Sequence, residues 1–274
     1  MTTWLTDIKG VLLDVDGVLY RGNEVIPGAR EFLAFLDQHH IPYVYVTNNS
    51  TLSPEQYAAR LRQKGFPARA EQVVGSAEAT ARLLVQEHSA RPTVLVIGEQ
   101  GLKEVLSRAG FPLTDNGDEA QVVVVGLDRY LTYDKLAEAT YAIRRGATFY
   151  GTNPDRTFPT ERGLAPGGGA ILAALEAATD RTAIMVGKPE PPIFRLGLER
   201  LGLPANQVLM VGDRVETDIE GAKRVGLRAA LVLTGVTREP PPPGPRAPDL
   251  VARDLTELQG LLAAAWASQR SYKA

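Results

Sequence analysis

Short apolar runs alternate with longer amphipathic stretches along the whole chain. A short apolar run bounded by turn residues is typical of a buried strand, whereas apolar residues at helical spacing predict a helix. The predicted strands cover residues 10–13, 43–46, 93–97, 121–125, 147–150, 184–186, 208–211 and 229–233. The predicted helices cover residues 29–39, 54–63, 77–87, 101–109, 133–144, 169–178, 192–201 and 217–224. This alternation predicts an α/β fold in which helices cover the faces of a parallel sheet.

Three of the predicted strands lead into a polar residue: Asp14 and Thr47 follow their strands directly, and Asp213 follows its strand after Gly212. In an open α/β sheet, ligands bind beyond the carboxyl ends of the strands, where the strand order reverses. Polar strand ends from both ends of the chain therefore predict one site at that edge. The segment of residues 78–183 has its own strands and helices but no acidic strand ends. We therefore predict a discontinuous core, residues 1–77 and 184–274, with an α/β domain of residues 78–183 inserted into it.

Composition and charge narrow the function classes. A chain of 274 residues, 44% of them hydrophobic, is long enough for two domains that each have a core. The formal net charge of −2 leaves no basic excess for a phosphate backbone, so we expect no nucleic acid partner. The absence of cysteine excludes disulfides, thiolate zinc sites and a cysteine nucleophile. The sequence has no apolar run of membrane-spanning length and no signal-peptide pattern at its start, so we expect no membrane partner and a cytoplasmic location.

The first candidate motif is Asp14-Val15-Asp16-Gly17-Val18, which directly follows the first predicted strand. Alternation along an extended chain puts Asp14 and Asp16 on the same side, and Gly17 lets the backbone turn away. Two neighbouring carboxyl groups can divide the work of a reaction, because one stays ionised and attacks while the other holds a proton. The alternative is a surface Asp-Gly turn, against which stands the buried strand immediately before it.

A second acidic group is formed by Gly212-Asp213-Arg214 and Thr217-Asp218-Ile219. Carboxylate oxygens are the ligands that Mg²⁺ prefers, so Asp213 at a strand end is a candidate magnesium ligand. Asp218 follows one helical turn later and is placed to orient Asp213 or a water on the metal. Capping of a helix N-terminus by acidic residues is the alternative, and it is stronger for Asp218 than for Asp213.

Two further motifs offer groups that suit a phosphate. Thr47-Asn48-Asn49-Ser50 follows a predicted strand and supplies hydroxyl and amide donors, although a turn before a helix cap would look the same. Gly187-Lys188-Pro189 fixes one cation between a glycine and a proline, and a fixed ammonium can neutralise a phosphoryl group. A lone lysine is more often a solvated surface residue. The turn Asn153-Pro154-Asp155 and the glycine-rich stretch 166–170 are weaker signals.

In this order, the four motifs resemble those of the haloacid dehalogenase superfamily of phosphohydrolases, and in particular its NagD-like, p-nitrophenyl phosphatase branch. Residues 14–22 resemble the first motif and the flap of that branch, and Thr47-Asn48-Asn49-Ser50 resembles its second motif. Gly187-Lys188-Pro189 is similar to the third motif, and the acidic group around Asp213 and Asp218 is similar to the fourth. Residues 153–155 and 166–170 also resemble the branch, although Gly168 stands where alanine or threonine is more usual.

The resemblance implies a Rossmann-like core with a large α/β cap inserted between the second and third motifs. It also implies that Asp14 is the nucleophile, that Asp16 is the general acid and base, and that Mg²⁺ is the cofactor. The residues implied for each role are Asp14, Asp16 (through its carbonyl) and Asp213 for the metal, Asp218 for its support, and Thr47, Asn48 and Lys188 for the phosphoryl group, with Asn49 a further candidate there. The implied partners are a small phosphorylated metabolite and, through the cap, a second copy of the chain.

Three other readings of the same residues remain open. A signalling receiver domain also needs acidic residues, a threonine and a lysine at strand ends, but it needs neither Asp16 nor an inserted domain. A dehalogenase needs no magnesium, so Asp16, Asp213 and Asp218 argue against it. A binding protein without activity would not need every catalytic position filled. The sequence leaves the physiological substrate open.

Overall fold

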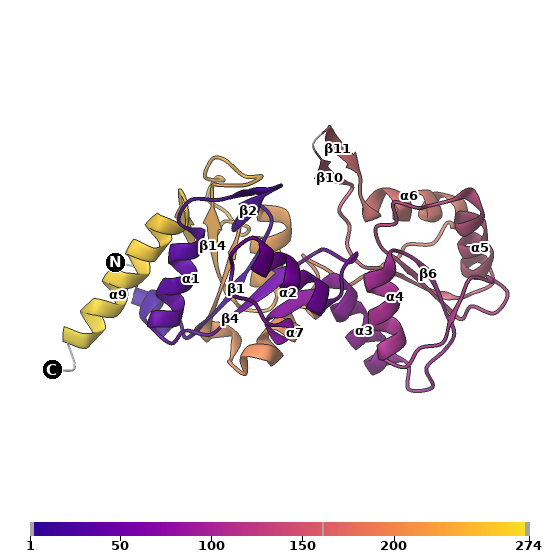
Figure 1. Ribbon diagram of the computed structural model, residues 1–274, viewed down its shortest axis with the longest axis horizontal. Helices are drawn as coiled ribbons and strands as arrows, with labels where there is room; N and C mark the ends of the chain where they lie inside the picture. Colours follow the sequence, from indigo (N-terminus) through magenta and orange to yellow (C-terminus); the bar gives the residue numbers. More distant parts are fainter. Residues whose placement is uncertain (1–2, 161, 272–274) are drawn as a thin grey trace. The chain divides into compact units, whose positions relative to one another are not determined.

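The computed structural model describes residues 3–160 and 162–271, which form two compact units. The first unit comprises the described residues of Met1–Val46, Arg60–Gln72 and Phe194–Ala274. The second unit comprises the described residues of Thr47–Ala59 and Val73–Ile193. Each unit is built around its own parallel sheet (Figure 1).

The first unit is organised around β1, which lies between a strand from late in the chain and one from early in it. The strands follow one another in the order β15 (Leu250–Ala252), β14 (Arg228–Val232), β13 (Val208–Gly212), β1 (Gly10–Leu13) and β4 (Tyr43–Thr47). All neighbours are parallel, and Leu13 of β1 is in register with Val211 of β13. Because β1 and β13 are buried along their whole length, both read as continuous apolar runs. This register puts the carboxyl ends of β1 and β13 side by side.

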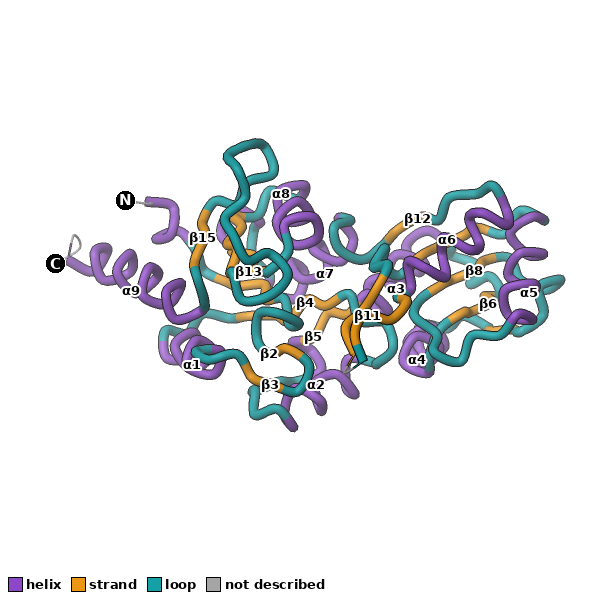
Figure 2. Tube along the Cα trace, turned by 90° about the horizontal axis from the view of Figure 1, so that it is seen from above, coloured by secondary structure: helices purple, strands orange, loops and turns teal. Residues whose placement is uncertain are grey.

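Helices and short turns complete this unit. The structure has η1 (Thr3–Asp7), α1 (Ala29–Gln38), η2 (Ala70–Gln72), α7 (Pro191–Leu201), η3 (Ala205–Gln207), α8 (Glu220–Arg224), α9 (Leu255–Ser271), the π-helical turn η4 (Val215–Ile219) and the hairpin β2–β3 (Tyr20–Arg21, Glu24–Val25). Helices α1 and α9 lie side by side (Figures 1 and 2). The rings of Phe35 and Trp266 stack between them at 5.4 Å, so α9 packs on α1.

The second unit contains the other parallel sheet. Its order is β12 (Ile184–Met185), β9 (Thr148–Gly151), β8 (Val122–Val125), β6 (Val94–Ile97) and β7 (Leu113–Thr114). Helices α5 (Tyr133–Arg144) and α6 (Gly168–Thr179) pack on one face, where Val123, Ile143 and Leu172 share one buried cluster (Figure 2). The remaining elements are α2 (Pro54–Gln63), β5 (Val73–Gly75), α3 (Ser76–Glu87), α4 (Gln100–Arg108) and the hairpin β10–β11 (Thr157–Thr160, Gly163–Pro166).

All of the predicted strands and helices exist, and the predicted fold class is confirmed. The predicted helix 217–224 is divided into the π-helical turn η4 and the short helix α8. The short strands β5 and β7 and the hairpins β2–β3 and β10–β11 were not predicted, because strands of two to four residues carry no readable periodicity. None of the helices within the described residues combines the length and apolar character needed to span a membrane.

Candidate active site

Three buried carboxylates meet at the carboxyl edge of the first sheet. Asp14 follows β1 and Asp213 follows β13, and the Asp14 N–H donates to the Val211 carbonyl of the neighbouring strand at 2.9 Å. Asp218 comes from the turn η4. One carboxylate oxygen from each of the three lies within 4.8 Å of the others, and only 8% of Asp14, 3% of Asp213 and none of Asp218 is exposed. The two strand ends therefore converge as predicted, and Asp218 joins them.

Asp213 is fixed by the loop that follows β14. Its Oδ2 accepts a hydrogen bond from the Val236 N–H at 2.6 Å, and its backbone carbonyl accepts one from the Thr237 N–H at 3.0 Å. The backbone of Gly235 passes so close that a Cβ on it would lie 1.8 Å from the same Oδ2. The loop thus holds the carboxylate by a backbone donor and leaves no room for a side chain at Gly235.

Asp218 is held by its own turn. Its Oδ2 accepts from the Arg214 N–H at 3.1 Å, and its own N–H donates to the Arg214 carbonyl at 3.0 Å. A Cβ on Gly212 would lie 2.2 Å from the Asp218 Cβ, so the strand end and the turn are in close contact. Backbone N–H groups therefore position both acidic residues of the fourth motif.

The turn after Asp14 separates the environments of the first two carboxyl groups. Asp16 is exposed, whereas Asp14 is buried. Gly17 has φ +86° and donates its N–H to the Tyr20 carbonyl at 2.8 Å, which closes the turn. Its carbonyl accepts from the Thr234 hydroxyl at 2.7 Å, so the loop after β14 also holds this turn. The Asp14 carboxyl group is thus shielded from solvent, whereas that of Asp16 is open to it.

Sequence reasoning missed the loop of residues 234–236. Thr234 and Gly235 come shortly after the apolar strand β14, at the same edge as Asp14 and Asp213. The sequence did contain a signal for this loop, because β14 is a fourth strand that is followed by a polar residue, Thr234, and a glycine, Gly235. The hydrogen bond that the Val236 N–H donates to Asp213 could not be predicted from the sequence, because every residue except proline carries a backbone N–H.

The second unit brings the remaining candidate residues together. Thr47, at the end of β4, accepts hydrogen bonds at its Oγ1 from the Asn49 N–H at 3.2 Å and from the Tyr57 hydroxyl at 3.4 Å. A hydroxyl has two lone pairs and one hydrogen, so both acceptor positions of Thr47 are occupied. Its hydrogen is not donated to any described residue. Thr47 can therefore donate to a bound anion.

Lys188 is 3% exposed and is tied to Asn48 through its backbone. The Asn48 Oδ1 accepts from the Lys188 N–H at 2.8 Å, and the Asn48 Nδ2 donates to the Lys188 carbonyl at 3.1 Å. The same Nδ2 donates to Asp155 Oδ2 at 3.2 Å. The second and third motifs therefore meet, and the turn around Asp155, a weak signal in the sequence, is part of the same cluster.

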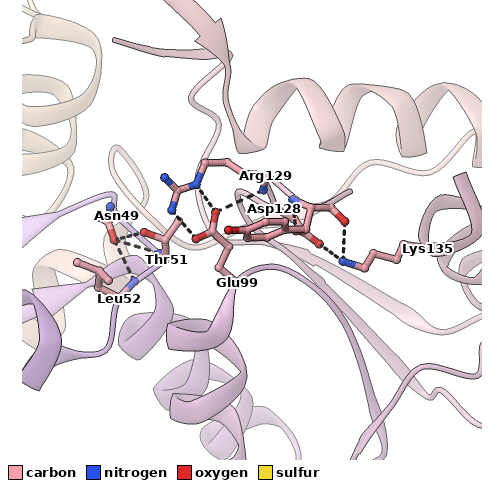
Figure 3. Close-up of polar contacts among 8 residues, drawn as sticks. Asn49, Thr51, Leu52, Glu99, Asp128, Arg129 and Lys135 are labelled. Atoms are coloured by element: carbon pink, nitrogen blue, oxygen red, sulfur yellow. Dashed lines mark hydrogen bonds and ion pairs between the residues drawn. The ribbon is translucent and has the colours of Figure 1, made fainter. Parts of the chain in front are cut away.

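Asn49 has a different task within its loop. Its Oδ1 accepts from the Thr51 N–H at 3.0 Å, the Thr51 hydroxyl at 3.1 Å and the Leu52 N–H at 3.2 Å (Figure 3). This pattern is that of a side chain that closes a turn before a helix. The alternative weighed for this motif, a turn with a cap, thus describes the Asn49 side chain.

Two acidic residues, Glu99 and Asp128, stand in loops of the second unit shortly beyond the ends of strands β6 and β8. Glu99 comes after β6 and accepts from Arg129 Nε and Nη2 at 2.7 Å each, and Asp128 comes after β8 and accepts from Lys135 Nζ at 2.7 Å (Figure 3). The hydrogen bonds to Glu99 raise the pKa of Arg129. The sequence pattern concealed both carboxylates because they stand beyond the last strand residues, in loops.

Comparison with known families and proteins gives one consistent result. Residues 11–112 match the model of the haloacid dehalogenase-like hydrolases, and residues 185–258 match that of the HAD-hydrolase-like proteins. An acid sugar phosphatase from Staphylococcus haemolyticus is 43% identical over 233 residues, which are 85% of this chain and 88% of the relative.

Two solved structures illustrate the similarity in fold. A p-nitrophenyl phosphatase from Archaeoglobus fulgidus has a TM-score of 0.85 at 35% identity and covers 93% of this chain and 99% of its own. A glycerol phosphate phosphatase from Mycobacterium tuberculosis, in complex with magnesium, has a TM-score of 0.85 at 36% identity over 94% of this chain and 79% of its own. The similarity extends over both units.

Proposed function

Because the chain belongs to the haloacid dehalogenase-like hydrolases and is a phosphatase of the p-nitrophenyl phosphatase branch, we propose that it hydrolyses small phosphate monoesters through an aspartyl-phosphate on Asp14, with Mg²⁺ as cofactor. The observation that carries this proposal is the meeting of Asp14, Asp213 and Asp218, with one oxygen from each within 4.8 Å. The relatives support it because the similarity extends across the motifs at both ends of the chain.

The donor set suits a magnesium ion. Buried carboxylates close to one another repel, and a divalent cation relieves that repulsion. Mg²⁺ takes hard oxygen ligands and commonly uses one or two carboxylates. We propose that Asp14, the Asp16 carbonyl and Asp213 hold it, while Asp218 supports the site. When bound, the ion offsets the repulsion between a carboxylate nucleophile and a phosphate dianion.

The chain's own residues supply the covalent chemistry. An Asp14 oxygen attacks phosphorus, and the bond between phosphorus and the ester oxygen breaks. Asp16 gives its proton to the departing oxygen, so the product leaves as an alcohol. Asp16 then takes a proton from the water that attacks the aspartyl-phosphate, which releases phosphate and restores both carboxyl groups. The exposed position of Asp16 fits proton exchange with substrate and water.

Thr47 and Lys188 fit the task of holding the transferred group. Phosphoryl transfer depends on positioning and charge neutralisation more than on covalent work by the protein. The Thr47 hydroxyl has its hydrogen available, as its two lone pairs are occupied. The Lys188 ammonium supplies a positive charge from a residue that is only 3% exposed, where charge interactions are stronger than in water.

For the substrate we propose a small phosphorylated metabolite such as a sugar phosphate or glycerol phosphate, the classes named for the relatives. We further propose that residues 78–183 act as a cap that selects the leaving group. A homodimer through this cap and a cytoplasmic location stay predictions.

The mechanism is tested by comparing Asp14→Asn with Asp16→Asn in single-turnover phosphorylation. Asp14→Asn should remove activity on every substrate, because it removes the nucleophile. Asp16→Asn should slow glycerol phosphate by ~10²–10⁴-fold but slow p-nitrophenyl phosphate much less, since a nitrophenolate leaves without a proton. Equal losses on the two substrates would reject Asp16 as the leaving-group acid, and an active Asp14→Asn would reject the nucleophile.

A further inference from the structure

The Asn48 side chain uses its hydrogen-bonding capacity on the protein itself. An asparagine amide has two N–H donors and one acceptor oxygen. The two hydrogens on Nδ2 go to the Lys188 carbonyl at 3.1 Å and to Asp155 Oδ2 at 3.2 Å. The oxygen accepts from the Lys188 N–H at 2.8 Å. No N–H of the amide is left to donate to a phosphate oxygen.

The chemistry of the partners fixes the orientation of this amide. The Lys188 N–H is a donor and must face the amide oxygen, whereas a carbonyl and a carboxylate must face the NH₂ group. Exchanging Oδ1 and Nδ2 would put two acceptors against an acceptor and two donors against each other. The three contacts therefore support one another, and each would be lost if the amide turned toward a ligand.

Asn48 is itself held in place from the other side. Its carbonyl accepts from Asn153 Nδ2 at 2.8 Å and from the Ser76 hydroxyl at 2.7 Å. The approach to the Lys188 loop is close, because a Cβ on Gly187 would lie 2.7 Å from the Asn48 Oδ1 and 2.4 Å from the Thr152 carbonyl. The Asn48 amide is thus fixed in place and forms hydrogen bonds with both the N–H and the carbonyl of Lys188, in a tightly packed loop.

We propose that the Asn48 side chain is a positioning residue that fixes the backbone of Lys188, and thereby the place of its ammonium, rather than a group that binds the phosphoryl oxygen. The proposal rests on the proposed phosphatase function, in which the ammonium must meet a defined phosphoryl group. A displacement of about 1 Å in such a group can cost ~10²-fold in rate. Loss of the two bonds to the Lys188 backbone should therefore lower the rate through Lys188, although the bond to Asp155 is lost with them.

A double-mutant cycle separates the two roles. We would measure kcat/KM for p-nitrophenyl phosphate with Mg²⁺ in the unsubstituted protein, Asn48→Ala, Lys188→Met and the double variant. Asn48→Ala alone should lower kcat/KM by ~10–100-fold. In the Lys188→Met background the same substitution should cost less than ~3-fold, because residues that act as a unit are not additive. Additive losses would overturn the proposal.

Asn49→Ala is the matched comparison. It removes three side-chain hydrogen bonds from the same loop, to Thr51 and Leu52, but none to Lys188. Its effect on kcat/KM should therefore add to that of Lys188→Met. If Asn49→Ala were as non-additive as Asn48→Ala, the effect would be general loosening of the loop and the proposal would fail. The free energy of unfolding identifies any variant that is not folded.

A second measurement does not depend on activity. The rate at which acetic anhydride acetylates the Lys188 amine, followed by mass spectrometry of the peptide, should rise at least several-fold in Asn48→Ala and stay unchanged in Asn49→Ala. Equal rates in the folded variants would overturn the proposal. Absence of hydrolysis by the unsubstituted protein would refute the proposed function, while the acetylation rates would still decide whether Asn48 holds Lys188.

Discussion

Replacing Gly235 with alanine tests whether Asp213 is the metal ligand that the loop after β14 positions. The new Cβ would lie 1.8 Å from Asp213 Oδ2, 2.4 Å from its Cγ and 2.6 Å from its Cβ. Real Cβ atoms keep at least 3.0 Å from such neighbours, so the loop and the carboxylate must move apart by about 1.2 Å. That movement stretches the hydrogen bond of 2.6 Å from the Val236 N–H to the same oxygen.

Two estimates of the effect agree. A hydrogen bond to a charged group contributes roughly 1.5–3 kcal/mol, and losing it corresponds to about 10–150-fold in an equilibrium constant. A shift of about 1 Å in a catalytic group costs ~10²-fold in rate. We therefore expect Gly235→Ala to lower kcat/KM by ~10–10²-fold at fixed Mg²⁺ and to raise the Mg²⁺ concentration needed for half-maximal activity.

The measurement is a Mg²⁺ titration of p-nitrophenyl phosphate hydrolysis, with Gly260→Ala as the control. Gly260 lies in α9, and a Cβ there would meet nothing within 4 Å. Alanine is favoured over glycine in a helix by about 1 kcal/mol, so the control should be slightly more stable and fully active. A folded Gly235→Ala protein with unchanged kcat/KM and Mg²⁺ dependence would refute the assignment of Asp213 and of the loop that holds it.

Two other predictions concern the metal and pH. Chelation with EDTA should abolish hydrolysis and Mg²⁺ should restore it, while Ca²⁺, which takes more ligands at longer distances, should restore it poorly; full activity in EDTA would contradict a metal-dependent mechanism. Burial, with a smaller contribution from Asp37, raises the pKa of Tyr43 from 10.0 to about 12. The stability that the protonated Tyr43 side chain contributes is therefore fully present below pH 10 and is lost as the pH rises through 12. Tyr43→Phe should therefore flatten the fall in the free energy of unfolding between pH 10 and 12, measured by urea titration; an unchanged slope would contradict this cause.

The parts of the fold that were predictable are those in which one residue pattern has one structural solution. Strands β1 and β13 are buried on both faces, so they could be read as apolar runs. Because the two strands are parallel neighbours, Asp14 and Asp213 at their ends had to lie at the same edge. The convergence of these two carboxylates was therefore predictable without knowing any distance.

The contacts of the loop of residues 234–236 with Asp213 could not be predicted from the hydrophobic and polar pattern of the sequence. Its contact with Asp213 is made by a backbone N–H, which is present at nearly every position of the chain and leaves no signature. The need for glycine at position 235 arises from a carboxylate distant in sequence, which approaches only once the sheet has formed. This requirement for glycine is imposed by tertiary packing, so the local sequence does not predict it.

Thr47 and Asn48, two neighbouring residues of one motif, also show that local sequence does not determine which groups remain for a ligand. By residue type alone both are donors suited to a phosphate, and they were assigned together. In the structure the Thr47 hydroxyl has both acceptor positions filled and its hydrogen left over, while both Nδ2 hydrogens of Asn48 are bound to Lys188 and Asp155. The partners that make this difference lie far away in sequence, so residue type predicts which bonds a side chain can form, and only the fold determines which of them remain for a ligand.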